Sequence, residues 1–243
     1  MLTTTTLKFS GPGAISGPAG GRIISITFCA VGQVRMRKII SRSSMRPTSK
    51  YPSLKNAVLN NHGEYCNEPN AFRWLDFDPE VLSYREQPCE IVYLDDDGVE
   101  CSHFPDIEVL ARTRPELWEI KAERYANADV IRRRTEILSA ELQSWGFVYR
   151  VMTAEELNLQ PRKDNMHKIL DFARRSVADS ERAMIADELS RNGPIVWHDV
   201  LKGKFGRFGR EIVCRLVIEG YLDLDLQVHF SDDTAFTLGS VRI

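Results

Sequence analysis

The stretch FPDIEVLARTRPELWEIKAE, residues 104–123, predicts two β-strands joined by a turn at residues 113–115. Asp106 opens the first strand, and Glu119 and Lys121 close the second. Alternate side chains of a strand point to opposite faces, so Glu119 and Lys121 share one face. If the two strands form a hairpin, Asp106 lies across from this pair. Two carboxylates and an ammonium group are therefore expected to meet at one end of a sheet.

This combination predicts a metal-dependent phosphodiesterase. Hydrolysis of a phosphodiester requires neutralised phosphoryl oxygens, an activated water and a stabilised leaving alkoxide, and a divalent metal ion can supply all three. Oxygen ligands favour Mg²⁺, with Mn²⁺ as the second choice. Asp106 and Glu119 are the predicted ligands, with the Ile120 carbonyl beside them and Glu68 of an upstream helix as the third carboxylate. Lys121 is predicted to stabilise the negative charge that develops during the reaction.

Each part of the pattern also occurs in proteins without catalytic activity. A Pro-Asp pair alone marks many turns, and Glu-x-Lys alone is common on exposed strands as a solvated ion pair. The combination of both with helices on either side favours the catalytic interpretation. Glu64 could replace Glu68, and Glu108 is either an extra ligand or, more in keeping with its place, a solvated residue at the sheet edge. His103 is expected to pack or bond within its hairpin rather than contact the metal.

The basic residues are concentrated near the start of the chain. The formal net charge is −2, yet the first 63 residues contain no Asp or Glu and nine Lys or Arg. Such asymmetry is typical of a basic arm that binds a polyanion, although a merely soluble tail is an equal alternative. The predicted DNA contacts are Arg37, Lys38, Arg42 and Arg46 in the arm, and Arg132 and Arg133 on a helix. For these two residues and the neighbouring Arg134, a solvated helix face paired with Glu136 and Glu141 is at least as good an interpretation.

Two features bear on the cellular setting. The five cysteines are scattered and include no CxxC pair, so the sequence indicates neither a disulfide framework nor a zinc knuckle. The longest apolar run, residues 23–32, is too short to span a bilayer. We therefore expect a reducing, cytoplasmic environment.

Three segments are predicted along the chain. Residues 1–50 are expected to form a Gly/Pro-rich segment, disordered over residues 1–22, followed by a basic arm. Residues 51–175 are expected to form a nuclease domain with helices at 64–75 and 128–145 and strands at 89–94, 99–104, 106–111, 117–121 and 147–152. Residues 176–243 read as a winged-helix domain, with helices at 176–191, 198–201 and 209–219 and a hairpin from 221–228 and 234–238.

Glu68, Pro105-Asp106 and Glu119-Ile120-Lys121 match the PD-(D/E)xK pattern of restriction-endonuclease-like nucleases. Around them, the basic stretch RKIISRS and the segments 64–68, 74–81 and 84–88 resemble the TnsA-type endonuclease subunit of heteromeric transposases. The resemblance covers about residues 36–160. It implies an α/β fold with an αβββαβ core and a mixed sheet, followed by a C-terminal winged helix. By this likeness, Glu68, Asp106 and Lys121 take the catalytic positions, and Glu119 takes a position where some relatives carry a non-acidic residue.

The resemblance also implies a function. TnsA-type subunits cut the 5′ strand at each end of a mobile element, while a separate DDE transposase cuts and joins the 3′ strand, and their C-terminal domain is associated with an AAA+ ATPase regulator. Two alternatives remain open: a phage, restriction or junction-resolving nuclease, and an inactive nuclease-like winged-helix DNA-binding adaptor. The intact acid-acid-lysine set argues against the adaptor.

Overall fold

The computed structural model describes residues 13–15, 21–30, 36, 48–56, 61–64 and 67–240. The chain folds into two compact units, of which unit 1 comprises Met1–Phe72 and Val81–Leu157 and unit 2 comprises Arg73–Glu80 and Asn158–Ile243. The boundary after Leu157 differs from the sequence prediction, which placed it after residue 175. Helix α5 (Arg162–Phe172) belongs to unit 2, where it packs against helix α8 (Gly209–Ile218).

The central sheet of unit 1 has the strand order β10-β9-β8-β5. Neighbouring strands are antiparallel except β9 and β10, which are parallel, so the sheet is mixed as predicted. Its strands are β5 (Val81–Glu86), β8 (Ile107–Ala111), β9 (Pro115–Lys121) and β10 (Val148–Thr153). Strand β5 was not predicted, because a register shift between Val81 and Ser83 interrupts its inward–outward alternation.

A second sheet contains the β6–β7 hairpin, which we had expected to continue the sheet of Asp106. Its order is β1-β2-β6-β7, with β1 (Gly13–Ile15), β2 (Ile23–Phe28), β6 (Cys89–Leu94) and β7 (Glu100–His103). Strand β1 lies within residues 1–22, which were expected to be disordered, and strand β2 follows them. Ile23, Ile26 and Phe28 are buried because β2 pairs with β6 and turns these side chains into the core.

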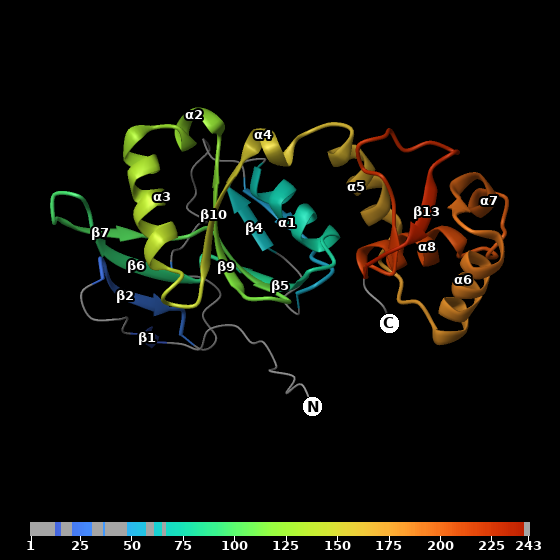
Figure 1. Cartoon of the computed structure of the whole chain (residues 1–243), viewed down its shortest axis with the longest axis horizontal. Helices are drawn as coiled ribbons and strands as arrows, with labels where there is room; N and C mark the ends of the chain where they lie inside the picture. The colour runs from blue at the N-terminus through green and yellow to red at the C-terminus, as the bar shows by residue number, and fades with distance from the viewer. Residues whose placement is uncertain are drawn as a thin grey trace. The chain divides into compact units, whose positions relative to one another are not determined.

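One face of the strands is covered by helix α3 (Asp129–Glu141), which follows the short helix α2 (Glu123–Ala126). Leu138 and Leu142 are fully buried in a core that includes Leu117 of β9 and Tyr149 of β10. Figure 1 shows α3 beside β10. The predicted helix extended to residue 145, but α3 ends at Glu141 and a turn follows. Gly146 ends that turn with a φ of 85°, a conformation that glycine adopts without strain.

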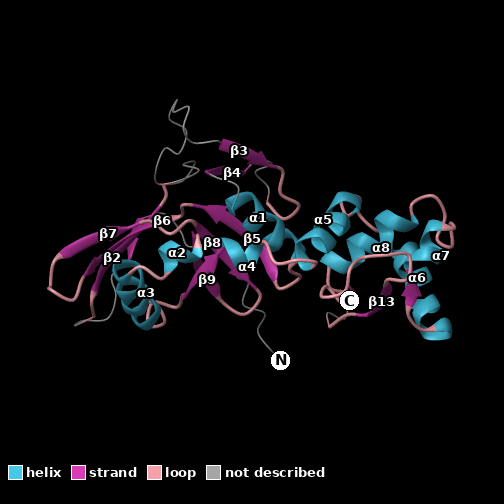
Figure 2. Ribbon diagram, turned by 90° about the horizontal axis from the view of Figure 1, so that it is seen from above, coloured by secondary structure: helices cyan, strands magenta, loops and turns pink. Residues whose placement is uncertain are grey.

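Helix α1 (Asn67–Phe77) lies on the other side of the central strands, as Figure 2 shows. Phe72 stacks on Tyr84 of β5 and on Tyr51, with ring centroids 5.7 and 6.1 Å apart. Glu64 was predicted to be the first residue of this helix, but it ends β4 (Asn61–Glu64), which pairs with β3 (Thr48–Tyr51). After β10, helix α4 (Ala154–Leu157) closes unit 1.

Unit 2 combines helices with a small antiparallel sheet of order β11-β13-β12. The elements after α5 are α6 (Asp179–Asn192), β11 (Ile195–Val196), α7 (Trp197–Leu201), α8, β12 (Leu222–Asp223) and β13 (Ala235–Leu238). Trp197 is buried against Phe172, Phe230 and Phe236.

The strand predicted at 221–228 is only two residues long, and Asn165 of α5 explains why. Its side-chain amide donates hydrogen bonds to the carbonyls of Leu226 and Val228 at 3.0 and 2.7 Å, and its Oδ1 accepts the Phe230 N–H at 3.0 Å. These backbone groups are therefore bonded to α5 instead of to a neighbouring strand. The same contacts tie α5 to unit 2 rather than to the sheets of unit 1.

No helix in the described part of the chain is long and apolar enough to cross a membrane. Cys29, Cys89, Cys101 and Cys214 carry free thiols.

His167 of α5 should make the stability of the protein depend on pH. Burial, together with the charges of Arg73 and Lys163, lowers the pKa of His167 below its usual 6.5. The unfolded chain then binds more protons near pH 6, so stability should rise as the pH increases from about 5.5 to 7.5. Calorimetric unfolding of the protein and of His167→Gln across this range should show a weaker pH dependence in the variant. Equal slopes would contradict the assignment.

Candidate active site

The β8–β9 hairpin brings Asp106 to the end of β9, as the sequence predicted. The backbone N–H of Asp106 donates to the Trp118 carbonyl at 2.9 Å, and the Gln87 N–H donates to the Asp106 carbonyl at 2.7 Å. The side-chain Oδ2 of Asp106 accepts the Ile120 N–H at 2.7 Å. The carboxylate is therefore held beside the last residues of β9 by backbone contacts on both sides.

Glu119 and Lys121 share a face of β9 and form a close ion pair. Lys121 Nζ lies 2.6 Å from Glu119 Oε1, and the Glu119 side chain is 3% exposed whereas that of Lys121 is 29% exposed. Burial alone would lower the pKa of Lys121, but the charges of Glu119 and Asp106 outweigh it and raise the pKa. Lys121 is therefore a cation that faces both carboxylates and still reaches solvent.

Arg134 is a further member of this cluster that the sequence analysis missed. Its Nη2 lies 3.2 Å from the same Glu119 oxygen that Lys121 contacts, and its side chain is 17% exposed. Arg134 had been grouped with Arg132 and Arg133 on a solvated helix face. Helical spacing could have separated it from them, because residues three and four apart share a face and Arg134 precedes the buried Leu138 by four.

His103 and Tyr149 are buried next to the ion pair of Glu119 and Lys121. The Tyr149 hydroxyl is hydrogen-bonded to His103 Nε2 at 3.0 Å, and the same nitrogen lies 3.3 Å from Glu119 Oε2. Burial raises the pKa of Tyr149, so this residue is a neutral phenol. His103 pairs with Ile91 within the β6–β7 hairpin, as expected, and its side chain also reaches Tyr149 of β10 and Glu119 of β9. His103 therefore packs against the Glu119 carboxylate.

The described contacts do not bring the predicted third ligand, Glu68, to the two carboxylates of Asp106 and Glu119. Glu68 lies in the first turn of α1 and is half-buried, and Glu64 lies in β4. In the described ranges, no three His, Cys, Asp or Glu side chains are grouped so that they could hold a metal ion. The Ile120 amide is bonded to Asp106, while the ligand role of its carbonyl stays a prediction, as does that of Glu68.

Asp106 and Glu119 nevertheless offer a donor set that suits a hard divalent cation. Mg²⁺ usually binds one or two carboxylates and completes its shell with water and substrate phosphate oxygens. Glu119 Oε2 is buried and accepts no hydrogen bond from the described residues, although His103 Nε2 lies 3.3 Å away. A buried carboxylate oxygen without a donor is energetically costly, and a cation would compensate it. The two carboxylates therefore fit a metal ion shared with a phosphate.

Glu108 is not the solvated edge residue that we had expected. It is fully buried on β8, and its Oε2 lies 2.6 Å from Arg85 Nη2 of the neighbouring strand β5. The Arg85 guanidinium also lies 5.7 Å from the centre of the Phe28 ring of β2. Glu108 thus belongs to a buried ion pair between strands.

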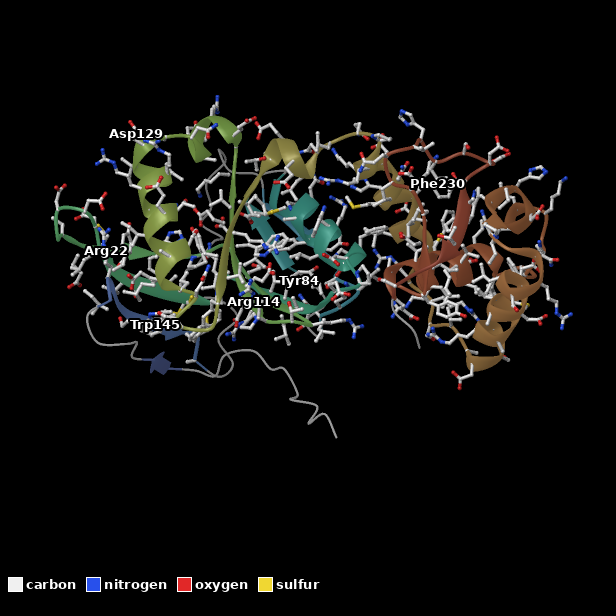
Figure 3. All side chains as sticks on the ribbon, viewed as in Figure 1. Arg22, Tyr84, Arg114, Asp129, Trp145 and Phe230 are labelled. Atoms are coloured by element: carbon white, nitrogen blue, oxygen red, sulfur yellow. The ribbon has the colours of Figure 1, made fainter. Side chains whose placement is uncertain are left out.

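Only some of the predicted DNA contacts can be placed. Arg37, Lys38, Arg42 and Arg46 lie outside the described residues. Arg132 is exposed on α3 and pairs with Asp129 at 2.8 Å, and Arg133 is exposed beside it. Figure 3 shows Asp129 at the end of α3 that is next to α2, the helix that follows Lys121, whereas Arg114 lies at the opposite end of the sheet. The two arginines of α3 are therefore on the part of unit 1 nearest the end of β9.

Comparison with known proteins agrees with the resemblance described above. Residues 78–154 match the family model described as TnsA-like endonuclease N terminal, a range that includes Asp106, Glu119 and Lys121. The match supports a TnsA-type endonuclease and confirms the predicted resemblance. No curated protein matches the sequence.

Proposed function

We propose that this protein is a Mg²⁺-dependent DNA endonuclease that cuts the 5′ strand at the ends of a mobile element, as part of a heteromeric transposase. The family match supports a nuclease of the transposase type. The observation that carries the proposal is the cluster of Asp106, Glu119 and Lys121 at the end of β9, inside the matched range. Mn²⁺ is expected to substitute for Mg²⁺.

Each residue of the cluster has a defined part in the proposed reaction. Asp106 and Glu119 hold the metal ion, which supplies charge neutralisation and a reactive water when bound. Lys121, charged and partly exposed, donates hydrogen bonds to a phosphate oxygen and stabilises the negative charge that grows there. Arg132 and Arg133 contact the phosphate backbone of the duplex and help to position it.

Unit 2 is proposed to be a winged-helix domain that docks an AAA+ ATPase regulator. The element order α6-β11-α7-α8-β12-β13 supports the winged-helix assignment, since three helices alternate with a three-stranded sheet in the sequence expected for that motif. A pocket of about 220 Å³ in this unit supports docking. It is lined by the aromatic rings of Phe172, Trp197 and Phe230, with Lys168 and Arg210 beside them.

Nicking of supercoiled plasmid that carries the element ends tests the function. The protein should be assayed with Mg²⁺ or Mn²⁺, together with the proposed DDE transposase and ATPase. We expect cleavage of the 5′ strand at the ends, which should stop when EDTA removes the metal and return when Mg²⁺ is restored. A protein that cuts equally well in EDTA would contradict the metal dependence. Random nicking would contradict the role in transposition.

A further inference from the structure

We infer that Arg134 is a positioning residue that holds Glu119 in place so that Lys121 is free to turn to the DNA phosphate. The inference rests on the proposed function and extends it to a residue on α3, outside the PD-(D/E)xK pattern. It starts from the fact that two cations, Lys121 Nζ and Arg134 Nη2, contact one oxygen of Glu119 at 2.6 and 3.2 Å.

The burial of Glu119 makes a permanent counter-ion necessary. Its side chain is 3% exposed, and removing one partner from a buried ion pair is strongly destabilising because the remaining charge is uncompensated. The metal ion is expected at Glu119 Oε2, so if Lys121 were the sole cation at Oε1, its departure would leave that oxygen without a counter-ion. Arg134 removes this conflict, since its guanidinium remains on Glu119 when the ammonium moves away.

The two cations are also placed differently. The Arg134 side chain is 17% exposed and lies on the buried side of α3, one helical turn before Leu138 in the core. Its Nε is buried and has no hydrogen-bond acceptor among the described residues. Lys121 is more exposed, at 29%, and lies at the end of its strand. Arg134 is thus fixed by its surroundings, while Lys121 has access to a ligand.

The contact predicts a characteristic response to Arg134→Gln. Without the guanidinium, Lys121 must stay on Glu119, so the turnover rate should fall while the KM for DNA changes little. The cluster also loses one positive charge, so the metal ion should bind more tightly. We expect both changes to be roughly tenfold, as for one charge that acts within about 4–6 Å. A purely structural loss would weaken metal binding and not strengthen it.

Mn²⁺ titration calorimetry on the full chain, with the cleavage assay beside it, tests this inference. Arg134→Gln should bind Mn²⁺ more tightly than the unmodified protein and cleave more slowly. In a Glu119→Gln background the same change should not slow any remaining cleavage further, because no buried charge is left to hold Lys121 in place. Glu136→Gln, an exposed change on the same helix, is the matched control and should behave like the unmodified protein.

A second variant guards against misfolding. Arg134 makes a single Nη2 contact with Glu119, so Arg134→Lys can supply the charge and should retain most of the turnover. If Arg134→Lys is as slow as Arg134→Gln, or if Arg134→Gln leaves Mn²⁺ affinity unchanged, the inference is wrong. If the unmodified chain binds no Mn²⁺, the proposed function fails and the inference fails with it. When the inference alone fails, the unmodified chain still binds Mn²⁺, so the two failures are distinguishable.

Discussion

Replacing Lys121 with alanine should lower the rate of DNA cleavage roughly 10²–10³-fold, the usual loss when one group that stabilises transition-state charge is removed. The carboxylates are held without it, since Asp106 Oδ2 accepts the Ile120 N–H and Glu119 keeps its contact with Arg134. Metal binding should therefore survive. Single-turnover cleavage by the assembled complex measures the rate, and Mn²⁺ calorimetry measures the binding.

Asp106→Asn is the companion variant, because its amide oxygen can still accept the Ile120 N–H and so preserve the end of β9. It should lose both cleavage and Mn²⁺ affinity, whereas Lys121→Ala should lose cleavage alone. Full activity in either variant would contradict the assignment of the site. Tighter Mn²⁺ binding by Lys121→Ala is compatible with the assignment, since that variant removes a cation next to both carboxylates.

The end of β9 could be predicted because its chemistry depends on local geometry. Alternation along a strand places Glu119 and Lys121 on one face, and a short hairpin places Asp106 opposite them. Both relations involve residues close together in sequence. The helices of unit 2 were found for a similar reason, since their apolar spacing repeats within one or two turns.

The parts that sequence analysis missed depend on pairing between distant segments. Strand β2 is ordered because it pairs with β6, more than sixty residues later, and nothing within residues 23–28 reveals that partner. His103 reaches Tyr149 of β10 for the same reason. Arg134 differs, because its place on the buried side of α3 follows from helical spacing. Its charge, however, suggested a solvated face, and only the buried Glu119 explains why an arginine lies there.

Glu108→Ala should lower the free energy of unfolding by about 3 kcal/mol, at the lower end of the range for breaking a buried ion pair. Glu108 is fully buried, and its carboxylate lies 2.6 Å from Arg85. The substitution removes the Glu108 carboxylate from the Arg85 guanidinium, which lies next to the Phe28 ring, and it also leaves a small cavity in the core. Urea unfolding of the full chain, followed by circular dichroism, measures the effect.

The double variant Glu108→Leu with Arg85→Met shows whether the pair itself stabilises the fold. Replacing a buried ion pair with apolar side chains of similar volume is often neutral, because neither charge then has to leave water. We therefore expect the double variant to be close to the unmodified protein, and Glu108→Ala to be far less stable than either. If Glu108→Ala costs nothing, Glu108 is not buried as described. If the double variant is as unstable as Glu108→Ala, the pair has a net stabilising role. In that case the cost of desolvating the pair is smaller than the attraction between its two charges. The Arg85 side chain, which is 25% exposed, would then retain enough hydration to lower that desolvation cost.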